Sequence, residues 1–132
     1  NFSKVLSIEG LTMLDLARRD IFPAARGYVR ELAKTAADVK AALPGAETPA
    51  EEETARELLT LNTEIAVKAK ELEALLSEAQ TVAETAAQAT FFAEKVIPVM
   101  QQLRSAADEA ESLTDEKAWP FPTYGDLLFS VT

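Results

Sequence analysis

The chain has 132 residues, a formal net charge of -9, and neither cysteine nor histidine. This length suits one domain with a modest core. The acidity disfavours binding to nucleic acid and to anionic membrane surfaces, because both need basic patches. The absence of cysteine and histidine excludes disulfides, thiolate metal sites and histidine general bases.

The sequence contains no apolar run near the ~20 residues of a membrane span, and no signal peptide is visible. With the lack of cysteine, this favours a cytoplasmic protein. The first residue is Asn1 rather than Met, so we expect a fragment or a processed chain.

The first predicted helix runs from about residue 8 to about residue 42. Ser7 is its expected N-cap, and residues 1–6 are expected to form an irregular lead-in. The apolar steps of three and four contain one gap of seven, where Arg18 is expected to extend to solvent or to pair with an acid. Leu43-Pro44-Gly45 should end the helix. Its apolar face is Leu11, Leu14, Ile21, Ala25, Tyr28, Leu32, Ala36, Val39 and Leu43.

The second predicted helix covers residues 49–79. Thr48 is its expected N-cap, Pro49 suits the first helical position, and Glu51 would complete a capping box with Thr48. The helix should pack through Leu58, Leu61, Ile65, Ala69, Leu72, Leu76 and Ala79.

The third predicted helix covers residues 82–113. Periodicity alone also permits one helix from Pro49 to Leu113, but such a helix would be roughly 100 Å long with half of it uncovered. We therefore place a turn near Gln80–Thr81, where Thr81 and Glu84 form a capping box. Phe91 and Phe92 are expected to fill space beside an alanine-rich seam. That seam is Val82, Ala86, Ala89, Ala93, Val96, Met100, Leu103, Ala107 and Ala110.

These elements predict an all-α fold, an up-down-up bundle of three long antiparallel helices over residues 1–113. Pro23 and Pro98 then fall at nearly the same height on helices that run in the same direction. Two independent kinks or one shared bend level would both fit this placement. One core should bury Leu14, Leu32, Leu61, Ile65, Leu72, Val96 and Leu103 together.

Residues 114–132 form a tail rich in aromatic residues and proline. Pro120 and Pro122 should keep it extended. We expect Trp119 and Phe121 to pack against the C-terminal end of the third helix and the adjoining end of the bundle. The part around Tyr124–Phe129 should reach further, along the bundle or onto a neighbouring subunit, because so apolar a segment avoids water.

The sequence offers little catalytic chemistry. A di-metal site in a helical bundle uses Glu-x-x-His motifs, a Ser or Thr nucleophile needs a base, and a phosphate loop needs clustered glycines. None of these is present, so we name no catalytic, cofactor-binding or metal-binding residue.

Three stretches carry a resemblance to a known family. Residues 7–17, SIEGLTMLDLA, continuing to Ile21-Phe22-Pro23-Ala24, resemble the helix after the catalytic barrel of type III glutamine synthetases. Residues 94–100, EKVIPVM, are similar to the last long helix of that family. The ending from residue 119 to residue 129, WPFPTYGDLLF, resembles its C-terminus.

The resemblance implies a cytoplasmic parent enzyme of nitrogen metabolism, built as stacked hexameric rings. Such an enzyme joins ammonia to glutamate with ATP and a divalent metal ion, Mg or Mn, in its preceding domains. This chain would then be a non-catalytic helical C-terminal domain that supports subunit packing or the catalytic core. Its partners would be the rest of the parent chain and neighbouring subunits of a homo-oligomer. The alternative is a free-standing helical interaction or adaptor module.

Overall fold

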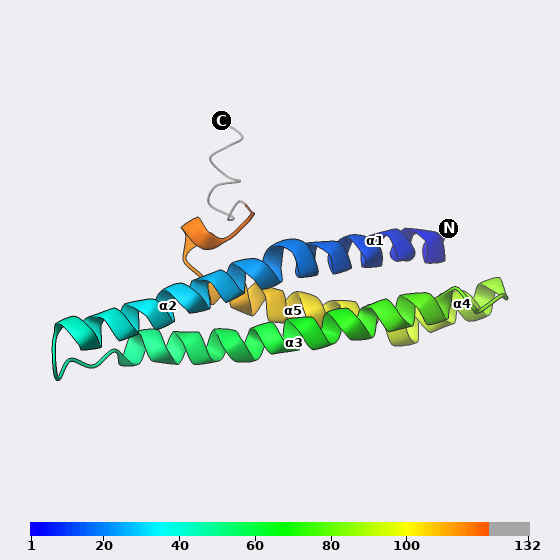
Figure 1. Cartoon of the computed structure of the whole chain (residues 1–132). Helices are drawn as coiled ribbons and strands as arrows, with labels where there is room; N and C mark the ends of the chain where they lie inside the picture. The colour runs from blue at the N-terminus through cyan, green and yellow to red at the C-terminus, as the bar shows by residue number, and fades with distance from the viewer. Residues whose placement is uncertain (122–132) are drawn as a thin grey trace, which may run out of the picture.

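Three long helical stretches lie beside one another in the computed structural model, which describes residues 1–121 (Figure 1). These residues contain helices and no strand, which confirms the predicted all-α class. A short 3-10 helix, η3, follows the third stretch at Glu116–Ala118. The first stretch is α1 (Phe2–Leu16), η1 (Ala17–Ile21) and α2 (Phe22–Ala42); the second is α3 (Pro49–Ala79); the third is α4 (Thr85–Phe91), η2 (Phe92–Val96) and α5 (Ile97–Leu113).

Helix α3 contacts both other stretches and carries much of the core. Its seven predicted apolar positions are all buried. Of the seven residues expected to share one core, six do so, while Leu32 is partly buried against that core. The core therefore forms along α3, between the α1–α2 stretch and α5. It contains Leu14, Leu58, Leu61, Ile65, Leu72, Phe92, Val96 and Leu103, among others.

The first helix begins at Phe2, so the expected lead-in over residues 1–6 and the N-cap at Ser7 were wrong. The Asn1 side chain is the N-cap, because its Oδ1 accepts a hydrogen bond of 2.9 Å from the Lys4 backbone N–H. An asparagine cap satisfies one of the N–H groups that a helix start leaves unpaired.

A π turn precedes each interior proline. In η1 the Phe22 N–H donates to the Ala17 carbonyl, five residues back, and in η2 the Ile97 N–H donates to the Phe92 carbonyl. Pro23 and Pro98 follow directly. Proline lacks the N–H that the carbonyl four residues earlier would accept, and its ring crowds that carbonyl. A wider turn lets the helix pass this point and continue.

Each π turn adds a residue to the helix and rotates the buried face. In the third stretch the predicted seam holds from Val96 to Ala110, but Ala86 and Ala93 are exposed and Phe92 is fully buried instead. In the first stretch, Ala17 fills the gap of seven residues, and Leu11 is 58% exposed rather than buried. The seam was predicted at a constant helical period, which a π turn interrupts.

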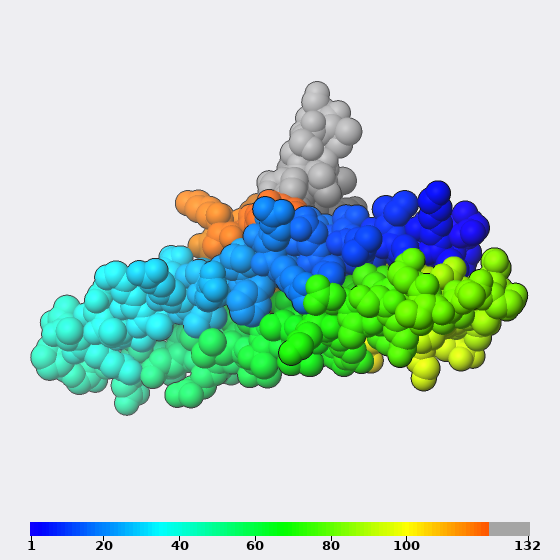
Figure 2. All heavy atoms as spheres, turned by 45° about the vertical axis from the view of Figure 1, so that its right-hand side comes forward, coloured from blue at the N-terminus to red at the C-terminus, as the bar shows by residue number. Residues whose placement is uncertain are grey.

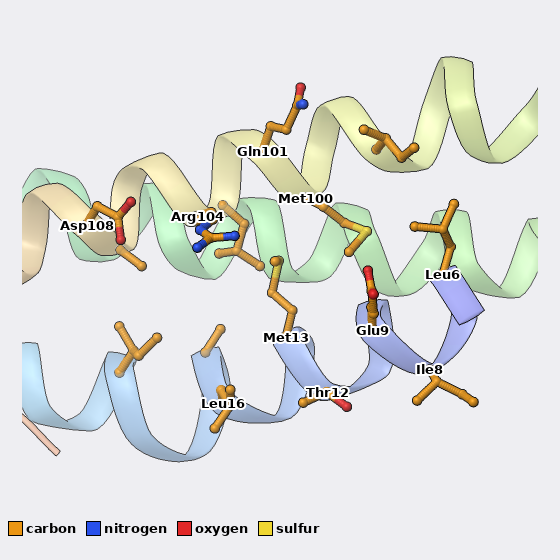
Figure 3. Close-up of a pocket in the computed structure, with 15 residues that line it drawn as sticks. Leu6, Ile8, Glu9, Thr12, Met13, Leu16, Met100, Gln101, Arg104 and Asp108 are labelled. Atoms are coloured by element: carbon orange, nitrogen blue, oxygen red, sulfur yellow. The ribbon is translucent and has the colours of Figure 1, made fainter. Parts of the chain in front are cut away.

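The two prolines do not share one level. Figure 3 places Arg104 of α5 across from Leu16 of α1, and both residues line one cavity. Pro98 precedes Arg104, whereas Pro23 follows Leu16, so they lie about 13 residues or about 20 Å apart along the bundle. The predicted match failed because the first stretch starts earlier, at Phe2, and the third starts later, at Thr85.

The first connection follows the expected stop signal. Ala46 N–H donates to the Leu43 carbonyl at 3.0 Å, which closes a turn around Pro44 and Gly45. Gly45 has φ +88°, a value suited to glycine at this turn position. Helix α3 then begins at Pro49, and Thr48 is its N-cap residue as expected, but the Thr48 side chain makes no capping hydrogen bond. Its Oγ1 instead donates to the Glu52 carboxylate at 3.2 Å.

The chain does turn after α3, which ends at Ala79, but the next helix starts at Thr85 rather than at residue 82. The expected capping box of Thr81 and Glu84 does not form. Instead the Glu84 carboxylate accepts hydrogen bonds from Ala86 N–H at 3.0 Å and Ala87 N–H at 2.7 Å. These bonds lower the pKa of Glu84, because they favour its charged form.

The segment after α5 returns over α2 (Figure 1). Trp119 is buried in the core cluster, and Phe121 packs partly against that cluster. The two rings meet edge to face, with centroids 6.5 Å apart. Burial, together with the charges of Asp115 and Glu31, raises the pKa of Tyr28 on α2. Residues Pro122, Thr123, Tyr124 and Phe129 of the predicted tail lie outside the described residues.

Candidate functional site

A groove with a volume of about 660 Å³ lies between α1 and α5 (Figure 3). In the close-up, Met13 of α1 and Met100 of α5 extend into the space between the two helices. The groove runs from Leu6 to Ile21 along α1 and η1. It exists because these two stretches pack mainly on α3 and meet each other less closely. The described apolar lining is Leu6, Ile8, Met13, Leu16, Ala17, Ile21, Ile97, Met100, Leu103 and Ala107.

Polar side chains lie along the same groove. Glu9 comes from α1, and Arg104 and Asp108 come from α5. Among the described residues, Arg104 has neither a hydrogen bond nor an ion pair. A mostly apolar cavity with a few polar groups is typical of a binding groove.

The surface of α1 also carries exposed apolar side chains, one of which, Ile8, lines the groove as well. Phe2, Val5, Ile8 and Leu11 follow one another at steps of three and are 51–59% exposed. We call these four residues the α1 row. Figure 2 shows this N-terminal helix at the surface of an elongated body. Large exposed apolar side chains gathered at one end of a helix make this end a candidate contact surface.

An ion pair joins η1 to α3. Arg18 Nη1 and Nη2 lie 2.8 Å and 3.1 Å from the two carboxylate oxygens of Glu73. This pairing raises the pKa of Arg18 and lowers the pKa of Glu73. Arg18 thus pairs with an acid, as one of its two sequence interpretations expected. Both side chains remain substantially exposed, so the pair adds little to stability.

The sequence analysis names no catalytic, cofactor-binding or metal-binding residue. Within residues 1–121, no group of three or more acidic side chains could hold a metal ion. None of the helices in that range is long and apolar enough to cross a membrane.

Sequence reasoning missed both candidate surfaces for identifiable reasons. The sequence pattern places Met100 and Leu103 in the apolar seam of the third helix and carries no signal for the cavity beside them. The α1 row went unnoticed because Phe2 and Val5 were placed in a non-helical lead-in. The regular three-residue spacing of Phe2, Val5 and Ile8 was the signal that could have revealed it.

Comparison with known proteins shows which proteins this helical chain is similar to. Residues 1–40, which cover α1, η1 and most of α2, match the family model described as glutamine synthetase C-terminal domain. A glutamine synthetase from Butyrivibrio fibrisolvens is 32% identical over 131 residues, which are 99% of this chain and 19% of that protein. A type-3 glutamine synthetase from Dictyostelium discoideum is 23% identical over 132 residues, 97% of this chain and 18% of that protein. No solved structure matches the chain at a significant level.

The chain spans about a fifth of the length of these curated relatives. The relatives match it almost from end to end, whereas the family model matches only the first helical stretch. The chain is therefore related along its length to glutamine synthetases, and its resemblance to the C-terminal domain of the type III enzymes is confirmed.

Proposed function

We propose that this chain is a non-catalytic, helical C-terminal domain of a glutamine synthetase that packs against the rest of the enzyme or a neighbouring subunit. The parent enzyme would join ammonia to glutamate, using ATP and a divalent metal ion held outside this domain. The three helical stretches of the chain would form an up-down-up bundle. The parent enzyme would be a cytoplasmic homo-oligomer.

The observation that carries this proposal is the α1 row. The exposed fractions of Phe2, Val5, Ile8 and Leu11 all exceed one half, and the four residues follow one another within three turns of one helix. Burying that apolar area against another surface is favourable by roughly 25 cal/mol per Å². About four-fifths of each relative lies outside the region that matches this chain. In a parent enzyme of that length, the remaining domains would be available to cover the α1 row.

Charge supports packing rather than catalysis. The chain has 22 acidic residues against 13 basic ones and no histidine. Glutamine formation needs groups that hold nucleotide phosphates and stabilise transferring charge, and these are normally cations, metal ions or helix N-termini. A domain with a strongly acidic helical surface is better suited to a supporting role.

The direct test is an assay of the purified 132-residue chain with glutamate, ammonia, ATP and Mg²⁺ or Mn²⁺. We expect a strongly helical circular-dichroism spectrum and no glutamine. ATP turnover that depends on glutamate would contradict the proposal. In the full-length enzyme, amide exchange in α1 should be slower than in the isolated chain, because a partner would cover the α1 row.

A further inference from the structure

The groove between α1 and α5 has apolar walls with no described segment covering them. Leu16 and Met13 form one wall, and Met100 and Leu103 form the other. A cavity of about 660 Å³ has room for several side chains. An apolar groove of this size in water favours an apolar occupant.

We propose that the C-terminal segment of this same chain, residues 122–132, docks in the α1–α5 groove. Its sequence is PTYGDLLFSVT, with large apolar residues at Tyr124, Leu127, Leu128 and Phe129. The inference does not use the proposed function, and either one can fail without the other.

The last described element, η3, lies on α2, the helix that continues from the Ile21 end of the groove. Trp119 lies in the core and Phe121 packs against it, so this segment is anchored on the bundle before residue 122. The anchored segment lies over α2. Helix α2 begins at Phe22, directly after Ile21, and Ile21 lines one end of the groove. The segment therefore starts near the groove's entrance.

Length is sufficient for the segment to occupy the groove. From Leu6 to Ile21 the groove extends about 23 Å at 1.5 Å per helical residue. Eleven residues reach up to about 36 Å when extended. Pro122 limits the freedom of the first residue, and anchoring at Phe121 makes the docking intramolecular. Both lower the entropy lost on docking.

Glu9, Asp108 and Arg104 make the described charged lining of the groove net acidic, and Arg104 is the one base in it that could pair with an acidic residue of the segment. The segment has one acidic residue, Asp126, and no basic residue. Arg104 lines the groove and has no hydrogen bond or ion pair among the described residues. Asp126 directly precedes the Leu127-Leu128-Phe129 run, so a carboxylate at Arg104 would place that run toward Met100. An Arg–carboxylate pair adds direction to apolar docking.

The chain contains its own probe for this test. Met13 and Met100 are its two methionines, and both line the groove. With ¹³C-methyl methionine, each gives one NMR signal. We expect nuclear Overhauser effects between the Phe129 ring protons and both methionine methyl groups. We also expect both signals to shift when the chain is ended at Phe121, because an aromatic ring shifts nearby methyl signals.

The controls separate docking from folding. Trp119 fluorescence should stay the same in the shortened chain, which reports an intact core. Arg104→Gln should move both methyl signals partway toward their positions in the shortened chain, whereas Leu59→Gln, on exposed α3 surface, should not.

Unchanged methyl signals after removal of residues 122–132 would overturn the proposal. So would shifts that depend on protein concentration, because they would mean that the segment comes from a second copy of the chain.

Discussion

Gly10 of α1 and Leu76 of α3 meet so closely that a Cβ on Gly10 would lie 2.9 Å from Leu76 Cδ2. Leu76 is itself buried, so its side chain has little room to move away. The absence of a side chain at residue 10 therefore lets the first stretch lie directly on α3. This close approach also positions the α1 row and one wall of the groove.

Gly10→Val should destabilise the chain by about 1–3 kcal/mol, because the added isopropyl group, Cβ included, overpacks the contact with Leu76. Gly27→Val is the matched control, since no atom lies within 4 Å of a Cβ there. Valine has a somewhat better helix propensity than glycine, so the control should be neutral or slightly stabilising. Urea unfolding measures both, and equal effects at the two glycines would show that the α1–α3 contact is loose.

Leu103→Ala should destabilise by about 2–5 kcal/mol. Leu103 is 1% exposed and belongs to the core cluster, so its removal leaves a cavity between α5 and α3. Leu59→Ala, on a residue that is 54% exposed, should change stability by no more than about 0.5 kcal/mol. A loss below about 1 kcal/mol at Leu103 would place this residue outside the core.

Asn62→Asp should make the chain less stable at pH 7 than at pH 4. Asn62 is buried, its Nδ2 donates to the Phe22 carbonyl at 3.1 Å, and its Oδ1 has no partner among the described residues. Burial would raise the folded-state pKa of the new carboxyl above its unfolded value. The variant therefore loses stability as the pH rises above the unfolded pKa of about 3.9. Stability that is the same at both pH values would show that water reaches this site.

The Glu84 carboxyl should titrate below the ordinary glutamate value of 4.5, because it caps α4 through two backbone N–H groups. A pKa lowered on folding means that the contribution is present above the unfolded pKa and is lost as the pH falls through the folded pKa. NMR titration of the Glu84 side chain measures this directly. A midpoint at or above 4.5 would mean that the cap is absent in solution.

The sequence predicted α3 best, because this element has a clear N-terminal signal and an uninterrupted apolar repeat. Pro49 begins α3, and its apolar positions from Leu58 to Ala79 repeat without interruption. The Leu43-Pro44-Gly45 stop signal also worked, because proline and glycine restrict backbone conformation locally. Such signals act over a few residues and can be read without knowledge of the tertiary contacts.

The π turns could not be predicted in the same way. Pro23 and Pro98 indicate that the helical hydrogen bonds are interrupted locally, but either a kink or a π turn can accommodate a proline. The choice decides whether Ala93 or Phe92 is buried, since one additional residue rotates the whole helix face. The groove depends on how far apart α1 and α5 settle on α3, which is a tertiary property with no local signal.

We expect the α1 row to form an interface with the rest of a glutamine synthetase. Val5→Asp and Val67→Asp form a matched pair for this test, because the two valines are 53% and 55% exposed on α1 and α3. Either change should be tolerated in the isolated chain, where both side chains face water.

The decisive measurement is the thermal unfolding midpoint of the full-length glutamine synthetase that carries each substitution, with its assembly size followed by light scattering. We expect Val5→Asp to lower the midpoint or dissociate the assembly, because a charge would be buried in the interface, while Val67→Asp leaves both unchanged. A full-length Val5→Asp enzyme with the midpoint and size of the unmodified enzyme would show that the α1 row is not an interface.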